Sequence, residues 1–453
     1  MNNLEISPDN NQNSLRTVLR AINFSQGQLS FIFLRCNYAK LRQQISAQIH
    51  QVSSIPIREI TLTASTKSFY NQISQELGNE QPPALMISGL DSVKNIDVIL
   101  NVSNQLREEF RKNFPFPILI WIDDQILKKI IRVAPDLESW GSILDFENDP
   151  EDLINLLQET TAEIFINDHI PSPQVYQEIE FATQDLQNRG AVINPEIQAG
   201  LNLAFGLREY QQDHLDQALS FYQKSAEFWQ NNNNTPPALS RTLPLARGGL
   251  EEGIGCNNLE RYGIILVKIS LVYTRKAEIN NSEDLENWQN SRNYLQQAVE
   301  IFEKAQRLDL VIQYINDLGE IFRHLKAWND LENLAQKSLK LYETLSSTIR
   351  KALIPPSLGG KGVRGLGQNY GFLAEVALEN QDYPKANQYA QQAIDILTKI
   401  PNVPSQAYSQ HRLFMSRSQV GLGEISAAIQ TLEIAKNQDR KSTRLNSSHQ
   451  IIS

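Results

Sequence analysis

The sequence contains little cysteine and no long hydrophobic run. Cys36 and Cys256 are the only cysteines among 453 residues, and neither has a partner at the spacing of a zinc or redox motif. This scarcity argues against a disulfide framework and favours a reducing compartment. The longest apolar runs, Leu29–Leu34 and Pro115–Ile122, are far shorter than the roughly 20 residues that span a bilayer. We therefore predict a cytoplasmic protein with no membrane partner.

Positive charge is also scarce. The chain has 42 Lys and Arg against 51 Asp and Glu, a net charge of -9, with no extended cluster of basic residues. Phosphate backbones are bound by a positive stripe, so nucleic acid is excluded as the expected partner. Hydrophobic residues make up 41% and charged residues 21% of the chain, which is ordinary globular usage. At roughly 150 residues per domain, the length predicts two to four domains.

Motifs for catalysis and metal binding are missing. The six histidines are scattered, with no pair at i, i+4 and no neighbouring cysteine, so their spacing does not predict a zinc site. The Gly-x-Ser-x-Gly elbow of hydrolases is absent as well. We expect no enzymatic activity, no cofactor and no metal.

Residues 25–170 alternate short β-branched apolar runs with helical patterns. This alternation predicts an α/β domain with a parallel sheet of about five strands. Residues 1–24 are expected to be a polar segment, and residues 171–195 a linker or helix. The predicted strands are Leu29–Cys36, Arg58–Thr63, Ala84–Leu90, Ile118–Ile122 and Ile143–Phe146.

The first predicted strand does not lead into a phosphate-binding loop. Residues 37–42, NYAKLR, supply neither the glycines nor the Lys-Ser/Thr pair of G-x-x-x-x-G-K-[ST]. Arg35, Asn37, Asp91 and Asp123 nonetheless stand near the carboxyl ends of predicted strands, where such sheets bind ligands. They are candidates for the remains of a nucleotide site.

A plainer interpretation of this polar edge stays open. Asp91 and Asp124 could each cap the helix that follows, which is common for aspartate. Arg35 and Arg42 could be surface or ion-paired arginines instead of phosphate ligands.

From residue 196 to 439 the strand signal disappears and amphipathic helices recur. A helix pair can bury its apolar stripe only against the next pair, so small residues must recur where helices meet. The interval from Ala298 to Leu331 is 33 residues, near the period of about 34 of tetratricopeptide (TPR) repeats. The segments that match are Leu201–Phe228, Tyr294–Ala305, Ile315–Tyr342, Tyr370–Leu397 and Arg412–Ala435.

Three stretches interrupt this pattern. Residues 235–255 and 352–367 are rich in Pro and Gly and are expected to be flexible insertions. Residues 440–453 lack an apolar stripe and are expected to be a non-native or disordered tail. The fold class is therefore an α/β domain followed by an all-α, TPR-like helical solenoid.

Several stretches of the sequence resemble a known family. Phe31–Arg42, Pro83–Val93, Arg107–Trp121 and Arg132–Trp140 are similar to cyanobacterial TPR proteins whose N-terminal domain is a degenerate, P-loop-like relative of STAND signalling ATPases. The resemblance spans residues 25 to about 435. It implies the two-part architecture and a cyanobacterial source, and it transfers no catalytic residue.

Two functions from different classes follow. The first is a scaffold whose TPR groove binds a protein or peptide, with a non-catalytic domain for docking or regulation. The alternative is a STAND-like switch controlled by weak nucleotide binding. The groove differs from the clamp that holds a carboxyl terminus with basic residues, because the equivalent offsets carry Asn316, Glu320, Gly371, Glu375, Leu413 and Arg417.

Overall fold

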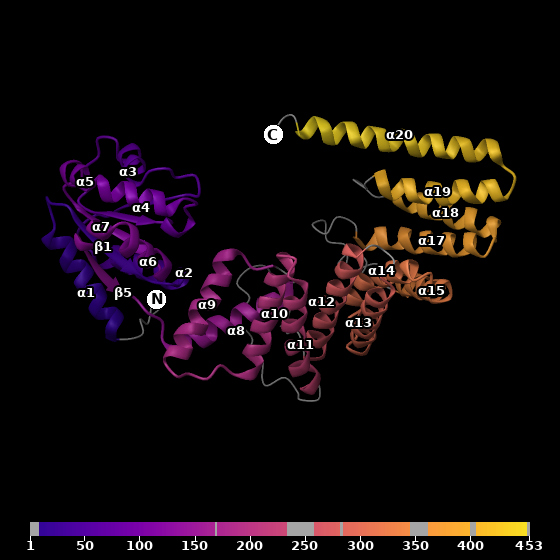
Figure 1. The fold of residues 1–453 in the computed structure, drawn as a ribbon, viewed down its shortest axis with the longest axis horizontal. Coiled ribbons are helices and arrows are strands. Elements are labelled where there is room, and N and C mark those ends of the chain that lie inside the picture. The colour runs from indigo at the N-terminus through magenta and orange to yellow at the C-terminus, as the bar shows by residue number, and fades with distance from the viewer. Residues whose placement is uncertain are drawn as a thin grey trace. The chain divides into compact units, whose positions relative to one another are not determined.

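The computed structural model describes residues 9–167, 170–232, 258–280, 284–344, 361–398 and 405–450, and these are mostly helical (Figure 1). Two compact units are present. Unit 1 comprises residues 1–160 and 171–194, and unit 2 comprises residues 161–170 and 195–453. Among the described residues, none of the helices combines the length and the apolarity needed to cross a bilayer.

Unit 1 contains a five-stranded parallel sheet, as the sequence predicts. Its strands lie in the order β2-β3-β4-β1-β5, so the chain leaves β1 for the far edge, returns strand by strand, and crosses to β5. Paired residues such as Ser30 and Pro117 on β1 and β4 fix the register. The strands are β1 Ser30–Arg35, β2 Arg58–Thr61, β3 Leu85–Ser88, β4 Pro117–Ile122 and β5 Gly141–Asp145.

Helices surround this sheet, including one that composition did not predict. Residues 9–24, expected to be a polar segment, form helix α1, because Leu15, Val18 and Ile22 fall on one buried face. Residues 96–113 form two helices, interrupted at Leu106. The helices are α1 Asp9–Phe24, α2 Ala39–Val52, α3 Phe69–Leu77, α4 Ile96–Gln105, α5 Arg107–Asn113, α6 Asp124–Val133, α7 Pro135–Ser139 and α9 Pro173–Asn188, with a short 3-10 helix η1 at Leu90–Ser92. Helix α8, Pro150–Asn167, begins in unit 1, and its residues from 161 onward belong to unit 2.

The described part of unit 2 is helical, and its helices contact one another in pairs. The first helices of the pairs are α10 Pro195–Gln211, α12 Asn258–Ile279, α14 Leu308–His324, α17 Lys361–Glu379 and α19 Ser405–Gly421. The second helices are α11 Leu215–Asn231, α13 Leu285–Lys304, α15 Trp328–Thr344, α18 Tyr383–Leu397 and α20 Ile425–Gln450. This succession of paired helices is TPR-like (Figure 1).

One turn geometry recurs between these helices. A single residue with φ between 53° and 80° stands two positions before the next helix begins. The residue after it donates its N–H to a carbonyl five residues back, at 2.8–3.0 Å, which is the Schellman motif. Four of these turns join the two helices of a pair and one joins α13 to α14. The left-handed residues are Asp213, Gln306, Lys326, Gln381 and Gly423.

The same turns define which residues are equivalent in unit 2. Five positions after each left-handed residue, the side chain is at most 2% exposed. Close helix contacts accompany this pattern. A Cβ at Gly206 would lie 2.4 Å from the Tyr222 ring, so glycine lets α10 and α11 approach. In second helices these residues are Ala218, Leu331, Ala386 and Ala428, and Val311 holds the same place after the turn that opens the first helix α14.

The 33-residue interval from Ala298 to Leu331 joins two positions that are not equivalent in the repeat. Leu331 is the fourth residue of α15, whereas Ala298 is the fourteenth of α13. Measured between helix starts, α13 and α15 are 43 residues apart, and α18 and α20 are 42 apart. The repeat is therefore longer than the TPR period of about 34, because its helices are long.

Two expectations about irregular segments need correction, and one is untested. Residues 361–367, part of a predicted flexible insertion, form the start of α17. Gly365 packs there, since its Cβ would lie 2.3 Å from Asn316 Nδ2. The backbone of the expected tail is helical as far as Gln450. The insertion at 235–255 and residues 352–360 lie outside the described residues.

The recurrent turn predicts opposite effects for two substitutions. Gly423→Ala should lower the free energy of unfolding by about 1 kcal/mol, because nothing crowds the Cβ but the left-handed conformation costs about 1–2 kcal/mol for an L-residue. Gln381→Gly removes that conformational cost, although glycine loses more backbone entropy on folding. The free energy of unfolding should therefore rise by up to about 1 kcal/mol. Urea denaturation followed by circular dichroism measures both. A Gln381→Gly variant clearly less stable than the parent would contradict the shared geometry.

Candidate functional site

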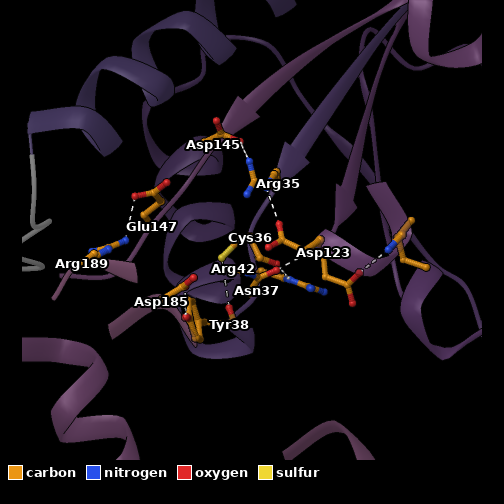
Figure 2. A network of polar contacts seen from close by, with 12 residues as sticks. Arg35, Cys36, Asn37, Tyr38, Arg42, Asp123, Asp145, Glu147, Asp185 and Arg189 are labelled. Atoms are coloured by element: carbon orange, nitrogen blue, oxygen red, sulfur yellow. Dashed lines mark hydrogen bonds and ion pairs between the residues drawn. The ribbon is translucent and has the colours of Figure 1, made fainter. Parts of the chain in front are cut away.

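The polar residues singled out in the sequence meet at the carboxyl ends of β1, β3 and β4 (Figure 2). Ligands in open parallel sheets bind at this edge. Here β1 ends at Arg35 and α2 begins at Ala39, so only residues 36–38 connect them. A three-residue connection without glycine cannot wrap a phosphate chain as a P-loop does.

Arg35 lies between two carboxylates of its own sheet edge. Its Nε is 2.6 Å from Asp124 Oδ1, and its Nη1 is 3.3 Å from Asp145 Oδ1 (Figure 2). The hydrogen bond to Asp124 raises the pKa of Arg35 above its ordinary value. The guanidinium is thus neutralised within the chain, as the ion-pair interpretation predicts.

Arg42 is engaged in the same way. Its Nη1 is 2.8 Å from Asp91 Oδ2, and its Nε donates to the Cys36 carbonyl at 2.7 Å. Asp91 lies inside the short helix η1, whose N-cap is Gly89, so the prediction that Asp91 caps a helix is wrong. The carboxylate neutralises Arg42 instead.

Asp123, not Asp124, caps the helix that follows β4. The buried Asp123 carboxylate accepts the N–H of Ile126 at 2.7 Å and the Gln177 amide at 2.9 Å. Asn37 Oδ1 accepts the N–H of Asp124 at 3.0 Å, which ties the end of β1 to the start of α6. The cap therefore sits one residue earlier than expected. All four candidates, Arg35, Asn37, Asp91 and Asp123, have their polar groups engaged within unit 1.

Helix α9 supplies a part of this site that the sequence did not reveal. Glu178 Oε1 accepts the N–H of Ala39, the first residue of α2, at 2.9 Å. The N-terminus of a helix after a strand is where a phosphate binds in nucleotide-binding folds, because free amides and the helix dipole favour an anion there. In this chain a carboxylate of the chain itself takes that position. Burial raises the pKa of Glu178 above its ordinary value.

Further contacts hold α9 against the same edge. The Tyr38 hydroxyl donates to Asp185 at 2.5 Å, and burial together with this bond raises the pKa of Tyr38 (Figure 2). Arg189 donates to the Asn148 carbonyl at 2.7 Å and pairs with Glu147 at 2.9 Å. Residues 171–194 are thus an integral part of unit 1, and Pro195 already belongs to α10 of unit 2. Their composition signalled a helix, but not that it would pack on the sheet edge.

Nucleophilic and metal chemistry have little support at this edge. Cys36 is buried, and burial raises the pKa of its thiol to about 11, so the thiolate needed for attack or metal binding is disfavoured at neutral pH. Within the described ranges, no group of three or more His, Cys, Asp or Glu side chains is placed to hold a metal ion.

Comparison with known proteins yields structural likeness only. No protein-family model and no curated protein matches the sequence. Among solved structures, BtubC (BKLC) from P. vanneervenii is 15% identical with a TM-score of 0.37, covering 65% of this chain and 92% of that one. The apo form of RapI is 13% identical with a TM-score of 0.44 (76% and 75%), and NprR with its cognate peptide NprX is 11% identical with a TM-score of 0.34 (72% and 77%). With TM-scores below 0.5, these likenesses do not extend to function.

We predict that ATP and GTP bind weakly or not at all. The glycine cradle and P-loop lysine are missing, Arg35 and Arg42 are neutralised, and Glu178 takes the phosphate position. Calorimetry on the full chain with magnesium should detect no dissociation constant below roughly 10 μM, about -7 kcal/mol. Tight, magnesium-dependent binding would contradict this interpretation of the edge.

Glu178 also predicts a pH dependence of stability. Because its pKa is raised in the folded state, the ionised carboxylate disfavours folding, and this penalty is present above the folded pKa and vanishes below the ordinary value of 4.5. Glu178→Gln keeps an acceptor for Ala39, so it should match or exceed the parent in melting temperature at pH 7, and the difference should disappear near pH 4.

The matched control is Glu178→Ala, which removes the acceptor altogether. It should cost about 0.5–1.5 kcal/mol at pH 7. If Glu178→Gln were as damaging as Glu178→Ala, the charge itself would be stabilising and the assignment of the pKa shift would be wrong. Thermal melts at several pH values distinguish these outcomes.

Proposed function

We propose that the chain is a protein-interaction scaffold: a degenerate P-loop-like α/β domain followed by a TPR-like solenoid whose groove binds a protein or peptide. The observation that carries this proposal is the recurrent left-handed turn, repeated at Asp213, Lys326, Gln381 and Gly423 between the helices of a pair. A turn that recurs in this way stacks similar helix pairs on one another, and stacked pairs offer one extended binding face.

The first helices of the last three pairs contact each other, which supports a continuous groove in that part of unit 2. Helix α14 contacts α17, and α17 contacts α19, although a second helix intervenes in the chain each time. Gly319 on α14 allows this approach, because its Cβ would lie 2.4 Å from the Phe372 ring on α17. A face built from one helix per repeat is well suited to bind an extended segment or a helix of a partner.

For the N-terminal domain we propose a non-catalytic role in docking or regulation within a cytoplasmic protein. The support is the internal neutralisation of Arg35 and Arg42 and the position of Glu178 at α2. The resemblance to cyanobacterial proteins is consistent with the same architecture. A nucleotide-controlled switch is less favoured, since a phosphate would have to displace Glu178 and compete with Asp91 and Asp124.

Site-specific photo-crosslinking in the host tests the scaffold. A benzophenone amino acid at Leu413, an exposed residue of first helix α19, should give a discrete cross-linked partner that unlabelled chain competes away. The control is the same group at Lys340, an exposed residue of second helix α15. Cross-linking from Lys340 alone, or from neither position, would contradict a partner in the groove.

A further inference from the structure

A pocket of about 220 Å³ opens among α14, α17 and α19, with a contribution from the end of α18. Phe372, Leu397 and Phe414 give it apolar walls, and Glu320, Gln368 and His411 are among its polar lining. The volume lies below the roughly 300–1,000 Å³ of sites for small-molecule ligands and cofactors. A space of this size suits one large side chain, and it lies on the first-helix face where the proposed partner binds.

The charged groups around the pocket do not balance. Arg323 lies beside the pocket and not in its lining, with its Nη1 2.9 Å from the lining residue Glu320 and its Nε 2.7 Å from Glu375. One guanidinium thus serves two carboxylates. The neighbouring Arg417 is paired with Glu379 at 3.6 Å and leaves the excess unchanged. The cluster keeps one uncompensated negative charge, and burial raises the pKa of Glu375 accordingly.

His411 adds a buried polar atom without a partner. The residue is 6% exposed, and its Nδ1 has no hydrogen bond. Gly371 makes room for the ring, since a Cβ there would lie 2.3 Å from His411 Cε1. Burial, reinforced by Arg323, lowers the pKa of His411 to about 4, so the ring is neutral at pH 7 and one of its nitrogens can accept a hydrogen bond. A native structure rarely leaves such an atom unmatched without a reason.

We infer that this pocket binds a single lysine or arginine side chain of the partner's peptide. The inference rests on the proposed scaffold function. The aliphatic stem would lie against Phe372, Leu397 and Phe414, and the cationic head would donate to Glu320. Lysine and arginine offer donors and no acceptor. This matches the Glu320 carboxylate, which already accepts from Gln368 at 2.6 Å and from Arg323 at 2.9 Å and keeps lone pairs for a further donor.

Other side chains fit this chemistry less well. A leucine or phenylalanine would cover the Glu320 carboxylate without giving it a hydrogen bond. An aspartate or glutamate would meet the carboxylates of Glu320 and Glu375 across a site whose arginine is already shared. These alternatives are outcomes of the experiment below.

Selection of displayed random 12-residue peptides on the immobilised full chain tests the inference. Enriched peptides should share one basic position, and their synthetic forms should bind about tenfold more weakly to Glu320→Gln, the cost of one charge-assisted hydrogen bond. Glu320 is partly exposed, so this near-isosteric change leaves the fold intact. The matched control, Glu300→Gln on the exposed surface of α13, should bind like the parent.

A charge exchange gives the second readout. The Glu320→Lys variant should no longer bind the peptides with a basic residue, and it should bind versions of them in which that residue is glutamate. Peptides without a shared basic position, or peptides bound equally by Glu320→Gln, would overturn the pocket assignment and leave the scaffold standing. Failure to enrich any peptide, together with no cross-link from Leu413, would overturn the scaffold itself.

Discussion

A single backbone hydrogen bond, from an N–H to the carbonyl five residues earlier, determines how unit 2 is built. It closes each turn at Asp213, Gln306, Lys326, Gln381 and Gly423, and it forces one residue into the left-handed region. Four of the five are not glycine, so the chain accepts about 1–2 kcal/mol of strain at each. In return, the side chain five positions after each of these residues is buried. Stacking, the first-helix face and the pocket all depend on this repetition.

The sheet of unit 1 shows how a ligand edge can be closed from within. Its carboxyl edge keeps the residue types of a binding site, arginine and aspartate, but pairs them with each other. Glu178 then occupies the helix N-terminus that a phosphate would use. The same physical attraction for an anion is present, and the chain satisfies it with its own side chain. Such an edge can stabilise a domain or present a surface, and it has little capacity left for nucleotide.

Most of the strands are predictable because β1, β3 and β4 are short apolar runs. Helix α1 is not, because its buried face is visible only once Leu15, Val18 and Ile22 meet a partner. The cap was placed one residue late, since neighbouring aspartates look alike in sequence. The turns share no residue type, so composition could not reveal them. The pocket cannot be predicted from the sequence, because Glu320 and His411 are far apart in the chain and only the stacking of three helices brings them together.

The two units differ in how far apart in the chain their first contacts lie. A turn of unit 2 needs only six consecutive residues, so it can form from local contacts soon after they leave the ribosome, and each helix pair then needs only its neighbour in the chain to bury its apolar stripe. Strand β1 must wait for β4, since Ser30 pairs with Pro117, and the edge is complete only when Glu178 arrives. During synthesis, the N-terminal unit therefore spends a long interval with an unpaired, wholly apolar strand, Phe31–Leu34, that is open to aggregation. Pairing with β4 and β5 ends that interval, and the docking of helix α9 is the last step in forming the N-terminal unit.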